Sequence, residues 1–374
     1  MVRAGLGPEL QCLFANDIDP KKARAYEQNW GGQNLIVDDV RNIDLHQLST
    51  AAGTKPVDLV WASFPCQDLS LAGDGAGLHG HRSGAFWPFW NLIEKLQQTN
   101  VAPSMIILEN VCGTLTANSG RDFANLIKAF STLEYRVGAL VINADAFVPQ
   151  SRPRLFIIGV KNTMKIPAHL VGAAPAGNWI TTPLSDAYQR LDGAGKAGWV
   201  WWSLEKPSQK ISELCEVIDL NGPDIEWHDA RETEKLISMM SAKNRSKLDL
   251  AKRQRKPVIG TMYRRTRREK EKGRVQRVEV RFDGIAGCLR TPAGGSSRQL
   301  VIAVDGEKIR TRLISARESA RLMGLADSYI LPSKLNDALR LTGDGVAVPV
   351  VSFLQEKLID PILSHNKSNL VRAA

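Results

Sequence analysis

The sequence is poor in cysteine and has no long apolar run. Its five cysteines (Cys12, Cys66, Cys112, Cys215 and Cys288) are scattered without C-x-x-C spacing, which argues against a zinc site or a disulfide framework. No apolar run approaches the ~20 residues of a membrane span, and the opening residues lack the apolar segment of a signal peptide. We therefore expect a chain that works in a reducing cytoplasm, binds no metal and enters no membrane.

The positive charge of the chain is unevenly distributed. The 374 residues are 43% hydrophobic, which is enough for a large core and an expected two domains. The formal net charge is +10, and the excess gathers in two basic runs, 252–256 and 264–268. A charge run is usually a solvated surface, but this clustering is also the pattern expected for contact with a phosphate backbone. We expect polyanion binding in this region.

Apolar runs alternate with helical segments through the first 160 residues. We predict strands at 12–15, 35–37, 57–62, 105–108 and 155–160, and helices at 20–30, 85–98 and 122–130. This alternation indicates a doubly wound, mostly parallel α/β sheet. A terminal helix at about 348–362 is expected to pack on that sheet.

Acidic residues stand at the ends of the first two predicted strands. A carboxylate at the carboxyl end of a strand suits a ribose diol, because it accepts two hydroxyl hydrogen bonds. Asp17 is the candidate for that contact, and Asp39 for contact with an adenine amino group. Taken alone, each acid is more often a helix cap or a solvated loop residue, and we expect Asp19 to be a cap.

The third predicted strand leads directly into Phe64-Pro65-Cys66-Gln67. Pro65 ends the strand because proline cannot donate a ladder hydrogen bond, and Cys66 opens a long glycine-rich loop. Ligands bind at this end of the strands in open α/β sheets. A lone cysteine is more often a buried structural residue, but this context and the residues downstream favour a thiolate nucleophile.

Three more polar residues stand beside predicted strands. Glu109 emerges from an apolar strand, where desolvation favours a protonated carboxyl group that can donate to a ring nitrogen. Arg152 and Arg154 alternate along an extended segment, so they should point the same way and bind a phosphate or a carbonyl oxygen. Without the other residues, a surface pair of arginines would be the default interpretation.

Four motifs occur in the order of a known family: Phe64-Pro65-Cys66-Gln67, Glu109-Asn110-Val111, Gln150-x-Arg152-x-Arg154, and the segment 317–324. Together they resemble the cytosine-5 DNA methyltransferases, which use S-adenosylmethionine. The resemblance covers most of residues 10–160 and 284–360, and the segment 287–299 looks like the form found in phage and prophage members.

The resemblance implies a catalytic set of Cys66, Glu109, Arg152 and Arg154. The Cys66 thiolate would attack cytosine C6 and make C5 nucleophilic, while Glu109 protonates or hydrogen-bonds N3 and Arg154 holds the base oxygen or nearby backbone. Loss of the C5 proton and elimination of Cys66 would restore the ring. The base would be flipped out of the duplex, and the loop 70–84 would close over it.

The resemblance also implies binding residues and partners. S-adenosylmethionine would be bound by Asp17, Ile18, Asp39, Val40, Pro65, Asp344 and Gly345. Double-stranded DNA would be bound by Arg264, Arg265, Arg267, Arg268 and Arg298. We expect a monomer, with a cognate restriction endonuclease as a candidate further partner.

The same resemblance suggests how the chain is divided. Residues 1–160 would form the catalytic and cofactor-binding domain, 161–334 the target-recognition domain, and 335–374 a segment that returns to the first domain. A tryptophan cluster in the middle region, at 199, 201 and 202, is more often core than a stacking platform.

The sequence departs from the family in two places. The family opens with a strand and a Phe-x-Gly-x-Gly-Gly turn, whereas residue 1 here lies roughly where that turn would have ended. We therefore expect a sheet without its first strand, and poor solubility or activity of this form. A DNA-binding pseudoenzyme and an RNA cytosine-5 methyltransferase are the alternatives, and the long basic region favours DNA. In the second departure, Asp344 replaces the more usual asparagine, which keeps the size but changes the charge.

Overall fold

The computed structural model describes residues 1–53, 57–64, 83–99, 101–222, 225–269, 273–292 and 298–372. The chain forms two compact units. The α/β unit consists of Val2–Asn143, Pro153–Lys206 and Val350–Ala374, and the hairpin unit of Met1, Ala144–Arg152 and Pro207–Pro349. The division of the chain at 160/161 and 334/335 into functional domains stays a prediction.

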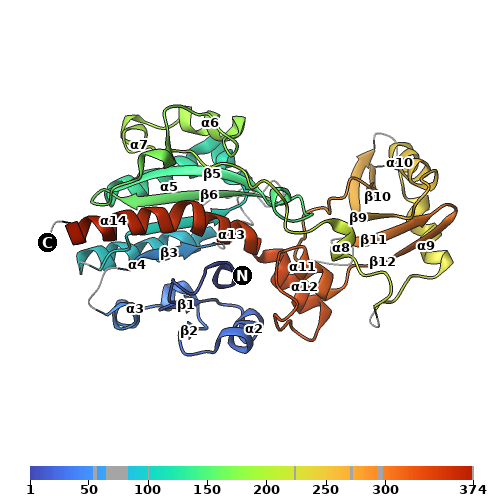
Figure 1. The fold of residues 1–374 in the computed structure, drawn as a ribbon, viewed down its shortest axis with the longest axis horizontal. Coiled ribbons are helices and arrows are strands. Elements are labelled where there is room, and N and C mark those ends of the chain that lie inside the picture. The colour runs from blue at the N-terminus through green and yellow to red at the C-terminus, as the bar shows by residue number, and fades with distance from the viewer. Residues whose placement is uncertain are drawn as a thin grey trace. The chain divides into compact units, whose positions relative to one another are not determined.

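The α/β unit is built on a four-stranded sheet (Figure 1). Its strands are β3 (Leu59–Ala62), β4 (Met105–Asn110), β5 (Tyr135–Asn143) and β6 (Pro153–Lys161), in the order β3-β4-β6-β5. β3 runs parallel to β4, whereas β6 runs antiparallel to both of its neighbours. The end of β4 therefore meets the start of β6.

Two helices supply much of the apolar core against this sheet. α4 (Phe86–Gln98) and α5 (Arg121–Thr132) lie close to the two predicted helices, and each buries apolar residues at helical spacing. Phe130 of α5 packs so tightly that a Cβ at Gly159 would lie 2.3 Å from its ring. A side chain at position 159 would therefore separate helix and sheet.

Residues 1–53 contain a second, two-stranded sheet. β1 (Ala15–Asn16) and β2 (Leu35–Ile36) are parallel and are connected through α2 (Pro20–Trp30). As predicted, Asp19 caps α2 by accepting a hydrogen bond of 2.8 Å from the Lys21 amide. Within the described ranges, β1 pairs with β2 and has no pairing with β3. The predicted strand at 12–15 was largely wrong, since β1 begins at its last residue.

The tryptophan cluster belongs to the α/β unit. β8 (Trp201–Trp202) pairs with β7 (Val171–Gly172), and both tryptophans are buried. The interpretation of these residues as core is confirmed. The remaining helical elements of this unit are α1 (Val2–Gly5), η1 (Val40–Asn42), α3 (Leu45–Ala52), η3 (Ser83–Ala85), η4 (Cys112–Leu115), η5 (Ala117–Gly120), η7 (Ala168–Leu170), α6 (Thr182–Gln189), α7 (Gly193–Ala197), a π turn (Gln355–Ile359) and α14 (Asp360–Arg372).

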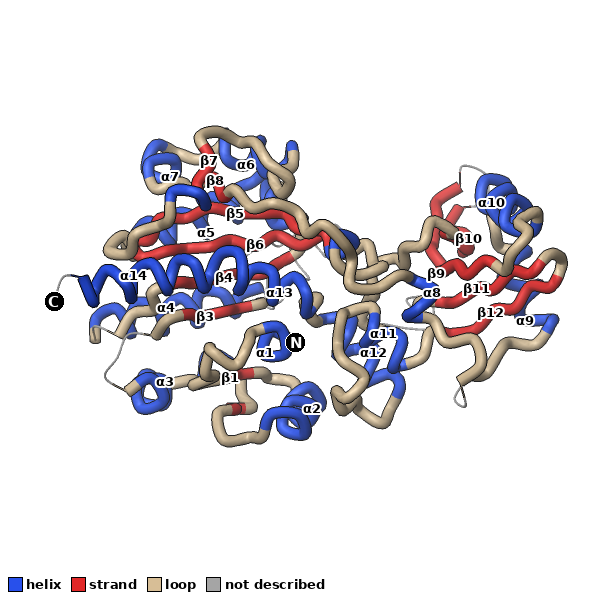
Figure 2. Tube along the Cα trace, viewed as in Figure 1, coloured by secondary structure: helices blue, strands red, loops and turns tan. Residues whose placement is uncertain are grey.

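The hairpin unit contains a four-stranded antiparallel sheet (Figure 2). Its strands are β9 (Val258–Glu269), β10 (Gly273–Arg281), β11 (Leu300–Asp305) and β12 (Lys308–Leu313), in the order β10-β9-β11-β12. Helices α9 (Ala230–Ser238) and α10 (Ala242–Lys252) pack on one face of it. The other helical elements are η6 (Ala144–Ala146), α8 (Leu214–Val217), α11 (Ala316–Arg321), α12 (Leu335–Asp344) and α13 (Val348–Leu354), which ends in the α/β unit.

Candidate functional site

A buried ion pair lies at the carboxyl end of β4. The Nε atom of Arg154 is 3.1 Å from Oε1 of Glu109, whose side chain is only 7% exposed. The two residues meet because β6 begins where β4 ends. Arg154 also donates a 2.9 Å hydrogen bond to the Pro153 carbonyl, which fixes the plane of the guanidinium. The predicted pair is therefore brought together, with the arginine balancing a buried negative charge.

The residue after Glu109 holds the end of the neighbouring strand. The side chain of Asn110 donates to the Phe64 carbonyl at 3.4 Å and accepts from the Val111 amide at 2.8 Å. These bonds fasten the chain just before Pro65 and Cys66. Both of those predicted residues, and the loop through 82, lie outside the described residues.

Cys112 is a second thiol near this pair, and no sequence motif pointed to it. Burial raises its pKa, which the nearby charge of Arg154 opposes and that of Glu109 reinforces. Because a protonated thiol is a poor nucleophile, Cys112 is unsuited to attack at neutral pH. It serves as a matched control for Cys66.

Arg152 has different partners from Arg154. Its guanidinium, in a residue that is 1% exposed, donates to the carbonyls of Leu289 at 3.0 Å, Gly343 at 2.8 Å and Gly345 at 2.6 Å. The expectation that both arginines present themselves to one ligand finds no support in these contacts. Arg152 instead holds together two backbone segments of the hairpin unit, one at Leu289 and one at 343–345.

Gln150 reinforces the same arrangement and was not selected from the sequence. Its amide donates to the Leu322 carbonyl at 2.8 Å and accepts from the Leu289 amide at 3.1 Å. The side chain is fully buried, so these bonds have no competition from water. The Gln-x-Arg-x-Arg spacing could have pointed to Gln150, because residues two apart in an extended segment project from the same side as Arg152 does.

Four of the predicted cofactor residues lie at one end of the β1–β2 sheet. Asp17 and Ile18 follow β1, and Asp39 and Val40 follow β2. Asp17 accepts a 2.8 Å hydrogen bond from the Asp19 amide, while Ile18 is 63% exposed. Asp39 caps the turn after β2 and lies 3.2 Å from the Arg41 guanidinium. Carboxylates beside an exposed apolar side chain suit a ribose joined to an adenine ring.

The other two described cofactor candidates belong to the hairpin unit. Asp344 is the last residue of α12 and accepts a hydrogen bond from the Thr291 hydroxyl. The carbonyl of Gly345 accepts from Arg152. Both positions are therefore held by side chains distant in sequence.

The predicted DNA-binding arginines are on β9, except for Arg298. Arg264, Arg265, Arg267 and Arg268 all lie in its second half, which pairs with β10. Arg298 lies between β10 and β11 in the sequence. Its guanidinium donates a 2.6 Å hydrogen bond to the Asn336 side chain. Arg265 and Arg267 share one carboxylate partner, Glu279.

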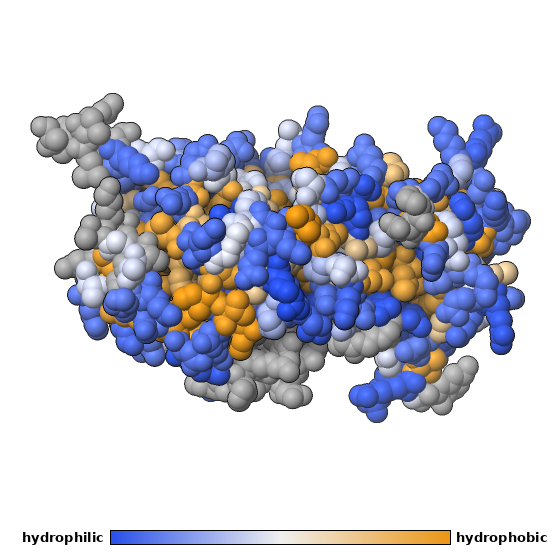
Figure 3. All heavy atoms as spheres, turned by 90° about the horizontal axis from the view of Figure 1, so that it is seen from below, coloured by the Kyte–Doolittle hydropathy of each residue, from blue (hydrophilic) through white to orange (hydrophobic). Residues whose placement is uncertain are grey.

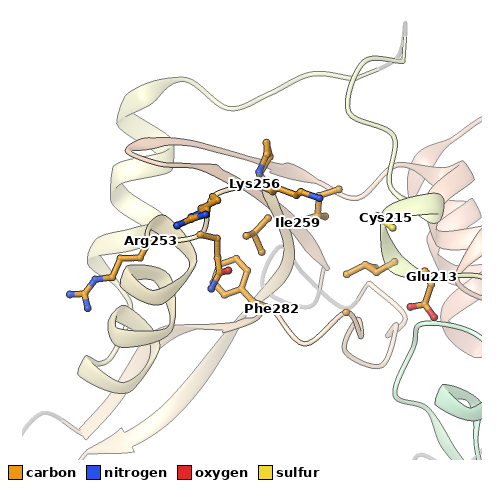
Figure 4. A pocket seen from close by; sticks show the side chains of 12 residues that line it. Glu213, Cys215, Arg253, Lys256, Ile259 and Phe282 are labelled. Carbon is orange, nitrogen blue, oxygen red and sulfur yellow. The ribbon is translucent and has the colours of Figure 1, made fainter.

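A hollow of about 750 Å³ opens elsewhere in the hairpin unit (Figure 4). Glu213 and Cys215 lie on one side of it, Arg253 and Lys256 on another, with Ile259 and Phe282 between them. Its lining includes part of the first basic run but none of the predicted site residues. Over the described ranges, no group of three or more His, Cys, Asp or Glu side chains could hold a metal ion.

On the face shown in Figure 3, hydrophilic side chains lie around several apolar groups. None of the helices in the described part of the chain is both long and apolar enough to cross a membrane.

Similar solved structures identify the fold. The Dnmt2 methyltransferase of S. pombe aligns with a TM-score of 0.55 at 18% identity, covering 94% of this chain and 91% of that one. A putative DNA modification methyltransferase encoded in an E. coli prophage aligns with a TM-score of 0.53 at 17% identity, covering 98% and 94%. The fold is that of Rossmann-like methyltransferases, and the predicted α/β class is confirmed.

Sequence comparison identifies the family. The profile of the C-5 cytosine-specific DNA methylases matches residues 2–360. Type II methyltransferase M.BanI of Aneurinibacillus aneurinilyticus is 25% identical, covering 97% of this chain and 91% of that protein. M.HpaII of Haemophilus parainfluenzae is 26% identical, covering 94% and 84%. The chain belongs to the C-5 cytosine-specific DNA methylase family, and the predicted resemblance is confirmed.

Proposed function

We propose that this chain transfers a methyl group from S-adenosylmethionine to C5 of a cytosine flipped out of a specific DNA duplex sequence, through a covalent adduct with Cys66. The buried Glu109–Arg154 pair carries this proposal. It lies at the end of β4, beside the strand that leads toward Cys66. An ion pair so little exposed is costly to maintain, which favours a chemical role.

Each residue of the site has its own role in the proposed methyl transfer. The Cys66 thiolate forms a bond to cytosine C6, the electron pair of the C5–C6 double bond shifts to C4–C5, and the pair of the C4–N3 double bond moves onto N3. For this step the Glu109 carboxylate first takes up a proton from solvent, and it then hydrogen-bonds N3 or gives that proton to it, which stabilises the charge that develops there. Arg154 orients Glu109 and holds the base oxygen. A base then removes the C5 proton after methylation, and the C6–sulfur bond breaks to release Cys66.

Members of this family generally use S-adenosylmethionine, which supplies an electrophilic methyl group. The residues around the β1–β2 sheet suit its nucleoside: Asp17 for the ribose hydroxyls, Ile18 for a ring face, and Asp39 with Val40 for the adenine edge. Pro65, Asp344 and Gly345 complete the proposed set. In this proposal Arg152 positions Gly345 through its carbonyl.

The proposed partner is double-stranded DNA, contacted by the arginines of β9 and by Arg298. In this proposal the protein is a monomer and acts in the reducing cytoplasm. A cognate restriction endonuclease is its further partner. Type II methyltransferases among the relatives support the last point.

Covalent trapping tests the function. A duplex library carrying 5-fluorocytosine should form a denaturation-resistant adduct with the protein in the presence of S-adenosylmethionine, because the fluorine cannot leave as the C5 proton does. Cys66→Ser should abolish the adduct, while Cys112→Ser should retain it. An adduct that persists in Cys66→Ser would refute the assignment.

A DNA-binding protein without methyl transfer is the second candidate. The observation that favours it is the separation of the β1–β2 sheet from β3 among the described residues. Titration calorimetry with S-adenosylmethionine distinguishes the two candidates, since binding of the cofactor by the folded chain supports the enzyme.

A further inference from the structure

The register of the β9–β10 hairpin divides the basic residues into two groups. Met262 of β9 packs in the core with Val278 and Val280 of β10. Side chains alternate along a strand, so Arg264 and Arg268 share the side of Met262. Arg265 and Arg267 project from the opposite face of the sheet.

A single carboxylate holds the second group. Glu279 lies directly opposite Tyr263 in the ladder and therefore on the same face as Arg265 and Arg267. Its carboxylate accepts a 2.8 Å hydrogen bond from Nε of Arg267 and a second bond from that guanidinium. The Nε atom of Arg265 is 3.6 Å from the other carboxylate oxygen.

Tyr263 completes the cluster. The Arg265 guanidinium lies 4.5 Å from the centre of the Tyr263 ring, a cation–π contact. Burial raises the pKa of Tyr263, and its hydrogen bond with Glu279 acts in the same direction against the charge of Arg265. We call Tyr263, Arg265, Arg267 and Glu279 the arginine cluster.

The arginine cluster remains open to a ligand. The side chains of Arg265 and Arg267 are 36% and 51% exposed. A guanidinium carries five N–H donors. Glu279 accepts hydrogen bonds from two nitrogen atoms of Arg267, Nε and one Nη. The contacts thus restrict the direction of each guanidinium without covering it.

A carboxylate at the centre is unfavourable for binding phosphate but useful for reading bases. Glu279 cancels one of the two positive charges and repels a phosphate group. A carboxylate that fixes the guanidinium plane assists bidentate recognition, in which arginine donates to O6 and N7 of guanine. Phosphate contacts need charge but little directional control.

We infer that Arg265 and Arg267, positioned by Glu279, read guanine bases of the DNA target, whereas Arg264 and Arg268 contact the backbone. The inference rests on the proposed function for its ligand, a DNA duplex. It refines the expectation that all four arginines bind phosphate. Glu279 is a positioning residue.

Enrichment of bound sequences from a randomised duplex library tests this inference independently of methyl transfer. Glu279→Gln keeps the size of the side chain and removes its charge, and Arg267→Lys keeps the charge and removes the planar fork. Each should reduce the preference for guanine at one or more target positions by roughly 5- to 150-fold, as expected for about 1–3 kcal/mol per bidentate contact. Arg268→Lys, on the other face, is the matched control and should enrich the same sequence as the unaltered protein.

Salt dependence separates the two kinds of contact. Arg268→Ala should reduce the slope of log Kd against log salt by about one phosphate contact, with the enriched sequence unchanged. Unchanged guanine preference in both Glu279→Gln and Arg267→Lys, or an unaltered protein that enriches no sequence, would overturn the inference. Failure of the proposed function would give a different result. The unaltered protein would then form no 5-fluorocytosine adduct but would still enrich a DNA sequence.

Discussion

Replacing Glu318 by alanine should strongly destabilise the protein. The Glu318 carboxylate accepts hydrogen bonds from Arg312 at 2.7 and 2.5 Å, and both side chains are 1% exposed. It also accepts from the amides of Asp219 and Ser315, each at 2.9 Å. One side chain thus joins three segments of the hairpin unit.

The magnitude follows from burial. Removing one member of a buried pair leaves an uncompensated charge, which costs about 3–5 kcal/mol. Arg312 would retain its bonds to the carbonyls of Asp219 and Leu313, which limits the loss to that range. Because native stability is only ~5–15 kcal/mol, Glu318→Ala should leave the protein marginally folded.

Urea unfolding followed by circular dichroism measures this change. Asp327→Ala is the control, since Asp327 forms a similar pair with Arg321 at 2.6 Å but is more than half exposed. We expect the control to cost less than about 1 kcal/mol. A loss below about 1 kcal/mol in Glu318→Ala as well would refute the reasoning that burial sets the cost.

Three further predictions concern the site and its support. Glu109→Gln should slow single-turnover transfer of labelled methyl groups by about 10²–10⁴-fold, because the amide cannot donate a proton to N3; an unaffected rate would exclude that role. The pKa of Glu318 is held below its ordinary value, since hydrogen bonds from Arg312 and Ser315 outweigh burial. Its stabilisation is therefore present above the unfolded pKa of about 4.3 and lost as pH falls through the lower folded pKa; acid unfolding should lose this pH dependence in Glu318→Ala. Asp17→Asn should weaken calorimetric binding of S-adenosylmethionine about tenfold or more, as expected for a lost charge-assisted hydrogen bond, and unchanged affinity would remove Asp17 from the proposed set.

Local signals allowed much of the α/β unit to be predicted. Asp19 and Pro20 mark the start of α2, because a cap and a first-turn proline act within a few residues. Apolar runs located β4 and β6, but such runs have the same composition in parallel and antiparallel strands. The direction of β6 relative to β5 could have been predicted from the short link 144–152 between them, because a parallel crossover needs a dozen or more residues.

The partners of buried polar residues could not be predicted in this way. Arg152 meets carbonyls that lie more than 130 residues further along the chain. Likewise, only the register of β9 and β10 shows that Glu279 is on the same face as Arg265 and Arg267. A basic run indicates charge, and it gives no direction for the individual side chains.

The Gln-x-Arg-x-Arg motif crosses a boundary between the two units. Gln150 and Arg152 belong to the hairpin unit, and Arg154 belongs to the α/β unit. The first two side chains bind backbone groups of their own unit, while Arg154 balances the charge of Glu109. The motif therefore has two kinds of contact: Gln150 and Arg152 fix the loops that contain Leu289 and Gly345, and Arg154 pairs with Glu109, its partner in the proposed chemistry. The spacing of the motif thus reflects a strand that begins where one unit ends, so its three residues need not converge on a single ligand.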